Sequence, residues 1–312
     1  MDSRGTSSAG RTAVLGTLAG AWLAGWTAWA PAGAAAEAIP IPNGSFERPA
    51  TAFVSLLLDS WQRLPKPEEY VETGGFLWSQ LTGIFANSPA GSVDHLTNLD
   101  GSQALWVFAV PGAGVYQELD GKGGGSPAGF QAGRAYRLSA RLLGAGGNML
   151  DEAALTLSLY YRDAGSLPVP VASLVVTNRA SLFPTRTQMV PCVLRSPVLA
   201  GGHPAVGRPI GIRVESTVTP ALQGGYWDVD DLRLEAVEAP VPALAVTARD
   251  GRLEIRWPGE AGWRYQLRRS AALGGWEAAG EAVDGTGGDL AVSVPVGEVG
   301  HEFFVVTAVP AP

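Results

Sequence analysis

The feature that most constrains this chain is a short-period alternation of apolar and polar residues between frequent glycines and prolines. In the segment YRLSARL the alternating positions are Tyr136, Leu138, Ala140 and Leu142. A period of two is that of a β-strand with one buried face. The sequence contains 41 Gly and 23 Pro, which separate such segments by turns. We therefore predict an all-β protein built from short antiparallel strands.

The strand-like segments fall into two groups, which predict two domains. The turn spacing of the first group favours an antiparallel β-sandwich. The segment EAPVPA at 238–243 has prolines in alternate positions, which favour an extended linker. It separates a larger domain at 39–237 from a smaller one at 244–312. Helical periods are scarce, and FVSLLLDSWQRL at 53–64 is the best candidate for a short helix.

The N-terminal residues 1–38 are predicted to form a signal peptide. Arg4 and Arg11 precede an uncharged stretch, and the small residues of PAGAAAEA follow it. Such a pattern predicts export, with cleavage after Ala36 or Ala38. An uncleaved membrane anchor is the alternative, since the uncharged stretch at 12–30 is just long enough to span a bilayer. No second one follows, so we expect no membrane span after cleavage and a secreted, cell-surface or periplasmic protein.

The charge and cysteine content exclude some function classes. The net charge is −7 and no run of Lys or Arg occurs, so nucleic acid is not an expected partner. Cys192 is the sole cysteine and stands in the apolar segment QMVPCVLRS. A buried thiol is the expected role, because a catalytic cysteine would need an activating base, and none is close in sequence.

Four short segments, taken in order, carry a family resemblance. IPNGSFERP ends at Pro49 and opens the larger domain, NLDGSQALWVF at 98–108 and GVYQEL follow, and YWDVDDLRLEAV closes it. Together they resemble the carbohydrate-binding-module-like, galactose-binding-like β-sandwiches. The resemblance spans 39–237 and implies a jelly roll of two antiparallel sheets with adjacent first and last strands.

The same resemblance implies a structural calcium ion near the meeting point of those two strands. The matching positions are Glu47, Asp230 and Asp231, with Asp100 as a further contributor. Calcium takes six to eight oxygen ligands, which carboxylates and carbonyls of distant segments can supply. Neighbouring residues of a strand point to opposite faces, so we expect one of Asp230 and Asp231 to join Glu47, and Asp228 to stay solvated. The alternative is a cluster of edge carboxylates that discourages strand pairing.

The smaller domain resembles the Ig-like or fibronectin-III-like β modules of bacterial secreted proteins. The segments LEIRWPGEAGWRYQLRRS and HEFFVV carry this likeness. It implies a spacing or attachment role for residues 244–312.

The sequence contains no recognisable catalytic motif. The three histidines stand far apart, none at metal-motif spacing, and no G-x-S-x-G is present. We therefore expect no catalytic residue. Sugars are bound by aromatic faces and amides, and the loop-rich region 51–97 offers both. The candidate ligand-binding residues are Trp61, Tyr70, Trp78 and Gln80.

These observations predict an exported, non-catalytic protein that binds a polysaccharide or glycoconjugate. The first alternative is an extracellular structural or adhesive protein that binds other proteins. The second is an unrecognised glycoside hydrolase, which would need two carboxylates facing each other across a cleft.

Overall fold

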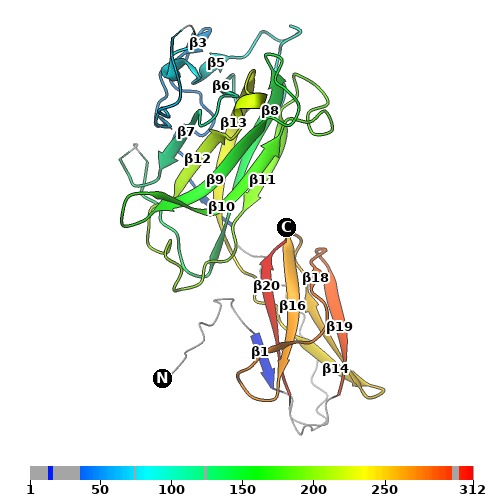
Figure 1. Ribbon diagram of the computed structural model, residues 1–312. Coiled ribbons are helices and arrows are strands. Elements are labelled where there is room, and N and C mark those ends of the chain that lie inside the picture. The colour runs from blue at the N-terminus through cyan, green and yellow to red at the C-terminus, as the bar shows by residue number, and fades with distance from the viewer. Residues whose placement is uncertain (1–12, 17–35, 74, 123–124, 297–301, 312) are drawn as a thin grey trace.

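The structure is a computed structural model that describes residues 13–16, 36–73, 75–122, 125–296 and 302–311 (Figure 1). Its regular structure is almost entirely antiparallel strand, which confirms the all-β prediction. The helical segments described are two 3₁₀ turns, η1 (Trp78–Gln80) and η2 (Pro220–Leu222). No helix in these described ranges has the length and apolarity needed to cross a membrane.

The predicted helix at 53–64 is wrong. This segment contains two short strands, β3 (Val54–Ser55) and β4 (Gln62–Arg63). β3 pairs with β5 of one sheet and β4 with β7 of the other. Pairing with two different sheets therefore overrides the weak helical pattern of the sequence.

The first sheet of the larger domain has seven strands in the order β11–β8–β13–β6–β5–β3, with β2 also paired to β13. We call it the seven-stranded sheet. The first and last strands of the domain are thus neighbours, as the resemblance implied. The remaining bounds are β2 (Ala36–Ile39), β5 (Thr82–Ala86), β6 (Gln103–Phe108), β8 (Arg134–Gly146), β11 (Val190–Arg195) and β13 (Tyr226–Glu238).

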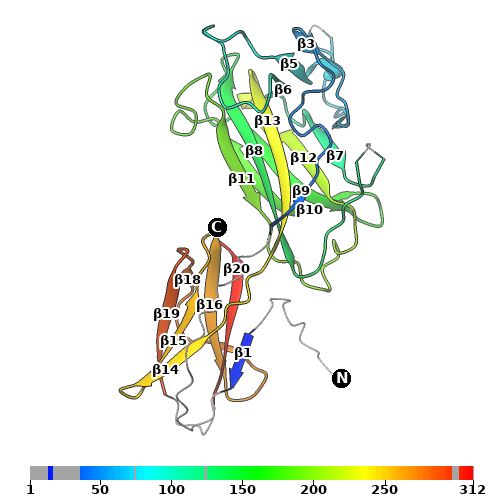
Figure 2. The same cartoon turned by 180° about the vertical axis from the view of Figure 1, so that it is seen from behind.

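The second sheet faces the first and is called here the opposite sheet. Its order is β10–β9–β12–β7–β4, and Figure 2 shows the two layers from behind. Alternate residues from both sheets form one core, among them the fully buried Leu138, Leu142, Leu157 and Ile212. The bounds are β7 (Gly114–Glu118), β9 (Ala154–Arg162), β10 (Pro168–Thr177) and β12 (Gly211–Ser216).

A bulge in β13 decides which way its carboxylates point. The pairing with β8 shifts between Asp230 and Arg233, and Asp231 has a φ of 52°. Before the bulge Trp227 and Val229 enter the core, so Asp228 faces away from it. The bulge turns Asp231 as well, because its carboxylate accepts a bond from Arg141, the residue paired with Asp230. The expectation that Asp230 and Asp231 point to opposite faces of the strand is therefore wrong.

The smaller unit consists of two further antiparallel sheets with their own core. One sheet is β14–β15–β19, and the other joins β1, β20, β16 and β17, with β18 also on β16. Trp257, Tyr265 and Phe304 are buried between them. The bounds are β1 (Ala13–Gly16), β14 (Ala245–Arg249), β15 (Arg252–Pro258), β16 (Trp263–Ser270), β17 (Glu277–Ala278), β18 (Val283–Asp284), β19 (Asp289–Pro295) and β20 (Phe303–Pro310).

The predicted domain boundaries fall close to the ends of strands. β13 ends at Glu238 and β14 begins at Ala245, on either side of the predicted linker at 238–243. Most of the predicted signal peptide lies outside the described residues. Its described parts are β1, which pairs with β20, and residues 36–38, which belong to β2. The signal peptide and the Ig-like assignment stay predictions.

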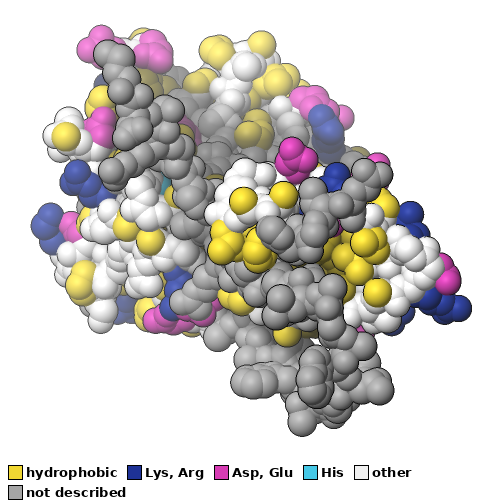
Figure 3. All heavy atoms as spheres, turned by 90° about the horizontal axis from the view of Figure 1, so that it is seen from below, with side chains coloured by type: hydrophobic (Ala, Val, Ile, Leu, Met, Phe, Trp, Pro, Cys, Tyr) yellow, Lys and Arg dark blue, Asp and Glu magenta, His cyan; other side chains and the backbone are white. Residues whose placement is uncertain are grey.

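The surface seen from below carries mixed charge. Lys and Arg side chains lie interspersed with Asp and Glu around patches of hydrophobic side chains (Figure 3).

Candidate functional site: an aromatic cavity around a buried acid

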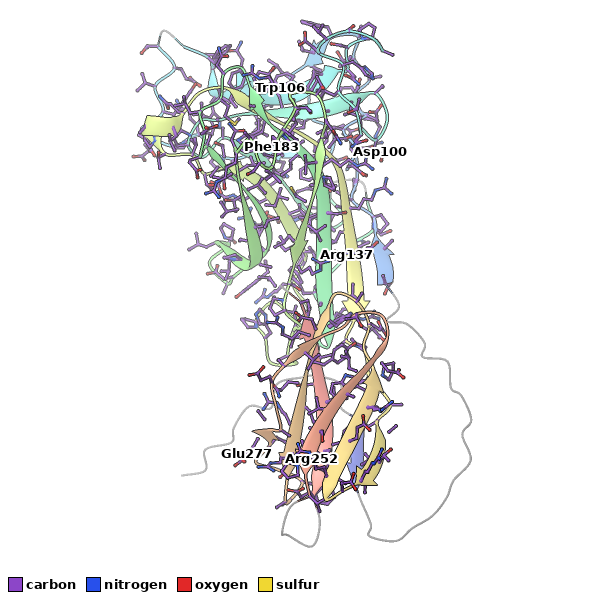
Figure 4. The ribbon with its side chains drawn as sticks, turned by 90° about the vertical axis from the view of Figure 1, so that its right-hand side faces the viewer. Asp100, Trp106, Arg137, Phe183, Arg252 and Glu277 are labelled. Atoms are coloured by element: carbon purple, nitrogen blue, oxygen red, sulfur yellow. The ribbon has the colours of Figure 1, made fainter. Side chains whose placement is uncertain are left out.

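The candidate site is a cavity of about 760 Å³ on the outer face of the seven-stranded sheet. Its floor consists of residues from β6, β8 and β13, and its walls come largely from the region 51–97. Figure 4 labels Trp106 in this upper part of the domain. The region predicted to be a loop-rich binding segment thus forms the sides of a cavity.

Cross-strand pairing sets the floor of the cavity. Asp228 of β13 stands opposite Trp106 of β6 on one side and opposite Leu143 of β8 on the other. Side chains of directly opposed residues lie close together on one face of a sheet. In the next row Tyr226 is paired with Phe108, and their ring centroids are 6.2 Å apart. The carboxyl group therefore lies among side chains with few polar atoms.

Glycine provides the space that the indole of Trp106 occupies. Gly83 of β5 is paired with Trp106, and a Cβ at this position would clash with the six-membered part of the ring. The ring nitrogen of Trp106 donates a hydrogen bond to the carbonyl oxygen of Gln80 at 3.2 Å. The indole N–H is thus already satisfied within the protein, and what remains for a ligand is an aromatic surface.

Asp228 is an unpaired acid inside this cavity. Its side chain is buried, at 5% exposure, and its Oδ1 has no hydrogen-bond partner in the part of the chain that the structure describes. Burial raises the pKa of Asp228 to about 8, because the charged form is poorly solvated. The carboxyl group is therefore mostly protonated at neutral pH. The prediction that Asp228 stays solvated is wrong, because the walls formed by region 51–97 cover this face of the sheet.

The mouth of the cavity combines exposed apolar side chains with one charge of each sign. Phe53 is 77% exposed and Phe76 is 54% exposed, and both line the cavity. Phe76 also packs on Phe108, with ring centroids 5.0 Å apart, so aromatic surface continues from the mouth to the floor. Asp94 and Arg186 are the charged residues at the mouth.

The residues predicted to bind sugar divide into two kinds. Trp61 and Trp78 are core residues, at 4% and 9% exposure, and their ring nitrogens donate to the carbonyl oxygens of Asn43 and Leu64. Their faces are therefore not open to a surface ligand. Tyr70 is half-buried and donates its hydroxyl to the Phe76 carbonyl oxygen. Gln80 lines the cavity.

The four carboxylates predicted to bind calcium are only partly free to do so. Arg141 pairs with Asp231 at 2.9 Å, and Arg233 pairs with both Asp231 and Asp100. Two of the four side chains thus have guanidinium partners. Within the described ranges no three His, Cys, Asp or Glu side chains gather into a metal-binding group.

Glu47 and Asp230 remain candidates, because both contact the turn at 100–103. Glu47 Oε1 accepts backbone N–H bonds from Ser102 at 2.8 Å and Gln103 at 2.7 Å. Asp230 Oδ2 accepts the N–H of Asp100 at 2.6 Å, while its buried Oδ1 has no partner among the described residues. Burial is the main cause that raises the pKa of Asp230 to about 7. The unpaired Oδ1 of Asp230 is a suitable ligand for a cation. Of the four carboxylates, only Glu47 and Asp230, with neighbouring carbonyl oxygens, therefore remain in the calcium hypothesis.

A second polar cluster with aromatic residues lies on the outer face of the opposite sheet. Tyr116, Arg213 and Ser158 stand in one row across β7, β12 and β9. Arg162 lies over the rings of Tyr116 and Tyr160, at 5.7 and 5.9 Å from the centroids. Glu118 pairs with Arg162 and accepts the Tyr160 hydroxyl, completing a cluster of hydrogen-bonding groups beside two rings.

Sequence reasoning missed the acid in the cavity. The available signal is that Asp228 stands between Trp227 and Val229, the two core residues of an alternating strand, which places it on the outer face. Nothing in the sequence shows that distant residues cover that face. The prediction for Cys192 is confirmed: the thiol is buried, and burial raises its pKa to about 11.

Comparison with known proteins gives matches among solved structures. No protein-family model matches the chain, and no curated protein does. A Stig cyclase from Fischerella sp. TAU, solved with (3Z)-3-(1-methyl-2-pyrrolidinylidene)-3H-indole, is 21% identical over 66% of this chain and 100% of its own, with a TM-score of 0.48. A cyclase from the same organism, solved with 4-(1H-indol-3-yl)butan-2-one, is 20% identical, with the same coverages and a TM-score of 0.47.

A carbohydrate-binding domain is also among the matches. The CBM22-1 xylan-binding domain from Paenibacillus barcinonensis Xyn10C is 14% identical over 63% of this chain and 93% of its own, with a TM-score of 0.34. Likeness at this level bears on the fold and carries no argument about chemistry.

The prediction that this protein is not an enzyme is contradicted. It rested on the absence of recognisable motifs, whereas the matched Fischerella proteins are described as cyclases. An acid catalyst on a sheet face needs no sequence motif, because its environment comes from distant segments.

Proposed function

We propose that this protein is an enzyme that protonates an apolar small molecule and so starts its rearrangement or cyclisation, with Asp228 as the general acid. The observation that carries this proposal is the unpaired, buried carboxyl group in an aromatic cavity. A carboxylic acid that keeps its proton at neutral pH can donate it to a substrate.

The surroundings of Asp228 suit a cationic intermediate. Protonation of a carbon–carbon double bond or an electron-rich ring leaves a positive charge on the substrate. Aromatic faces attract a nearby cation, and Trp106, Phe108 and Tyr226 supply such faces in the cavity. The apolar walls also keep water from trapping the cation.

The substrate class that best fits is a flat aromatic molecule of about the size of a substituted indole. The cavity volume of about 760 Å³ is within the usual range for small-molecule sites. The ligands of the two Fischerella cyclases are indole compounds, and we transfer that class to this chain as part of the proposal.

Deuterium exchange tests the proton transfer directly. In D₂O, Asp228 would add a deuteron to C3 of indole and the carboxylate would take back the C3 proton, so the C3–H signal disappears. We expect the full chain to accelerate this exchange and Asp228→Asn to lose the acceleration by about 100-fold or more, the usual contribution of a general acid. Asp289→Asn, at an exposed position of β19 in the smaller unit, is the control and should retain it. An unaccelerated exchange in the wild-type protein would reject this role for Asp228.

Glycan binding is a second candidate function, on the outer face of the opposite sheet. The cluster of Tyr116, Tyr160, Arg162 and Glu118 favours it, since rings and paired polar groups are the means of sugar binding. Affinity electrophoresis in gels containing xylan tests it. Retardation that is lost in Tyr116→Ala would support this function, and unretarded migration of the wild-type protein would contradict it.

We also propose that the protein is exported, whichever of the two candidate functions it has. The apolar N-terminal segment and its small-residue cleavage pattern support it. The N-terminal sequence of the protein recovered from the medium or periplasm of its host would test it.

A further inference from the structure

We infer that the ligand of the cavity carries a basic nitrogen, an amine or imine, which accepts the proton of Asp228 and is held as a cation against its carboxylate and the rings of Trp106 and Tyr226. This inference rests on the proposed cavity site, and it assigns the Asp228 proton to a nitrogen of the ligand where the proposed function assigns it to a carbon atom.

The first argument is that the protein leaves Asp228 without a partner. The other acids on this face have at least one partner: Arg141 and Arg233 pair with Asp231, and the Asp100 N–H donates to Oδ2 of Asp230, whose Oδ1 is unpaired. No such contact exists for the Oδ1 of Asp228 within the described ranges. A buried polar group without a partner is costly, so the missing donor is expected to come from the ligand.

The second argument is that the surrounding side chains suit a cation. The strands on either side place Trp106 and Leu143 opposite Asp228, and neither titrates. The indole N–H of Trp106 is bonded to Gln80, which leaves the ring as an electron-rich surface. A cation gains from such rings, whereas an anion is repelled by them.

The third argument concerns the balance of charge. A neutral amine that enters the cavity takes the carboxyl proton through its lone pair, which breaks the O–H bond and forms an N–H bond. The products are an ammonium and a carboxylate in contact, so the cavity gains no net charge. A net charge in a site without water would be energetically costly. A neutral hydroxyl ligand cannot form this pair.

The other titratable or charged groups that line the cavity are Asp94, Arg186 and Tyr226. Asp94 attracts a cation and Arg186 repels it, both from the mouth. Burial, and then the charges of Asp228 and Asp94, raise the pKa of the Tyr226 hydroxyl, so it stays neutral around pH 7. The preference for a nitrogen base is therefore assigned to Asp228.

Three probes of similar size and different charge test the inference on the full chain by titration calorimetry. They are 2-phenylethylamine, 2-phenylethanol and 3-phenylpropanoate. We expect the amine to bind at least about tenfold more tightly than the alcohol, which corresponds to one well-formed charged contact, and the anion to bind most weakly. Asp228→Asn should abolish the difference between amine and alcohol, while Asp289→Asn, at an exposed position of β19 in the smaller unit, should preserve it.

Proton release gives a measurement that needs no variant. At pH 7 the amine arrives as a cation and Asp228 must lose its proton, so repeating the titration in buffers of different ionisation enthalpy should show release of about one proton. Affinity should rise from pH 6 to 8 and fall again above the pKa of the amine. Equal affinity for amine and alcohol, binding without proton release, or an amine preference that survives Asp228→Asn would each overturn the inference.

The inference and the proposed function fail in different ways. Exchange at indole C3 that depends on Asp228, without an amine preference, would leave the proposed function standing and remove the inference. An amine preference that depends on Asp228, without exchange, would do the reverse.

Discussion

Two acids on the outer face of β13 show how strongly surroundings change one residue type. Asp228 has no partner for its Oδ1 among the described residues, while Asp230 accepts a backbone N–H from Asp100 at 2.6 Å. Both are buried, and for both the main cause of the raised pKa is loss of solvation. Asp228 opens into a cavity of aromatic residues, and this position makes it the stronger candidate for chemistry.

Asp228 should make the folded protein less stable as the pH rises. Its pKa is raised from an ordinary value of 3.8 to about 8 in the folded protein. Between these values the unfolded chain has lost the proton and the folded chain retains it, so the stability contribution present below pH 4 is lost as the pH rises to about 8. The loss is roughly 1.4 kcal/mol per pH unit over this interval.

Urea unfolding at a series of pH values measures this effect. Asp228→Asn should flatten the slope, leaving the smaller contribution of Asp230, which has the same sign and ends near pH 7. Asp94→Asn at the mouth serves as the control and should follow the wild-type slope. Parallel curves for the wild-type protein and Asp228→Asn would contradict the burial of an uncharged Asp228.

Calcium binding at Glu47 and Asp230 is a further prediction about single residues. Added calcium should raise the melting temperature and EDTA should lower it, because a ligand bound only to the folded state stabilises it. Asp230→Asn should remove most of the response. Asp231→Asn should keep it, since Asp231 already pairs with Arg141. A melting temperature that neither calcium nor EDTA changes would reject the hypothesis.

At the scale of single elements, the cavity depends on how β5, β6 and β13 are paired. The register of β6 places Trp106 between Gly83 and Asp228. A slip by one residue would send every side chain of β6 to the other face, moving Trp106 into the core. The aromatic floor is therefore a property of the pairing as much as of the residues.

Gly83→Ala should disturb both stability and the cavity. A Cβ at this position would clash with the Trp106 ring and lie 2.7 Å from the Ser55 carbonyl oxygen. We expect a loss of about 1–3 kcal/mol in the free energy of unfolding and weaker binding of indole, both measurable by fluorescence titration. Gly75→Ala is the matched control, because nothing lies within 4 Å of its added Cβ. Equal stability of the two variants would show that Trp106 is not held as described.

At the scale of the whole molecule, two hydrophobic cores follow one another along the chain. The larger lies between the seven-stranded and opposite sheets, and the smaller lies within the C-terminal unit. Figures 1 and 2 show two bodies joined at one end. Ala135, Val237 and Ala239 pack against the smaller core, so the larger domain contributes residues at the junction.

Scanning calorimetry should therefore show two unfolding transitions. Leu138→Ala removes a fully buried side chain from the larger core and Ile255→Ala does so in the smaller one. Each should lower the transition of its own domain, by about 2–5 kcal/mol in unfolding free energy, and leave the other nearly unchanged. A single transition lowered by both substitutions would mean that the two cores unfold together.

The alternation of residues was enough to predict the class of fold. The alternating segment YRLSARL lies within β8, because a period of two is a local property. The segment 53–64 was predicted wrongly, since its pairing partners are far away in sequence. The burial of Trp61 and Trp78 was not predicted for a related reason, since composition does not tell which aromatic residues a loop region buries.

What the sequence determined by itself was the all-β class, through patterns that each strand carries locally. It also placed three acids between Trp227 and Leu232, without showing what each does. Only the tertiary structure decided that Asp228 lies in a cavity, that arginines pair with Asp231, and that Asp230 retains a free oxygen. The physical reason is that solvation and pairing of a charge are set by residues brought from far along the chain, and local periodicity contains no record of them.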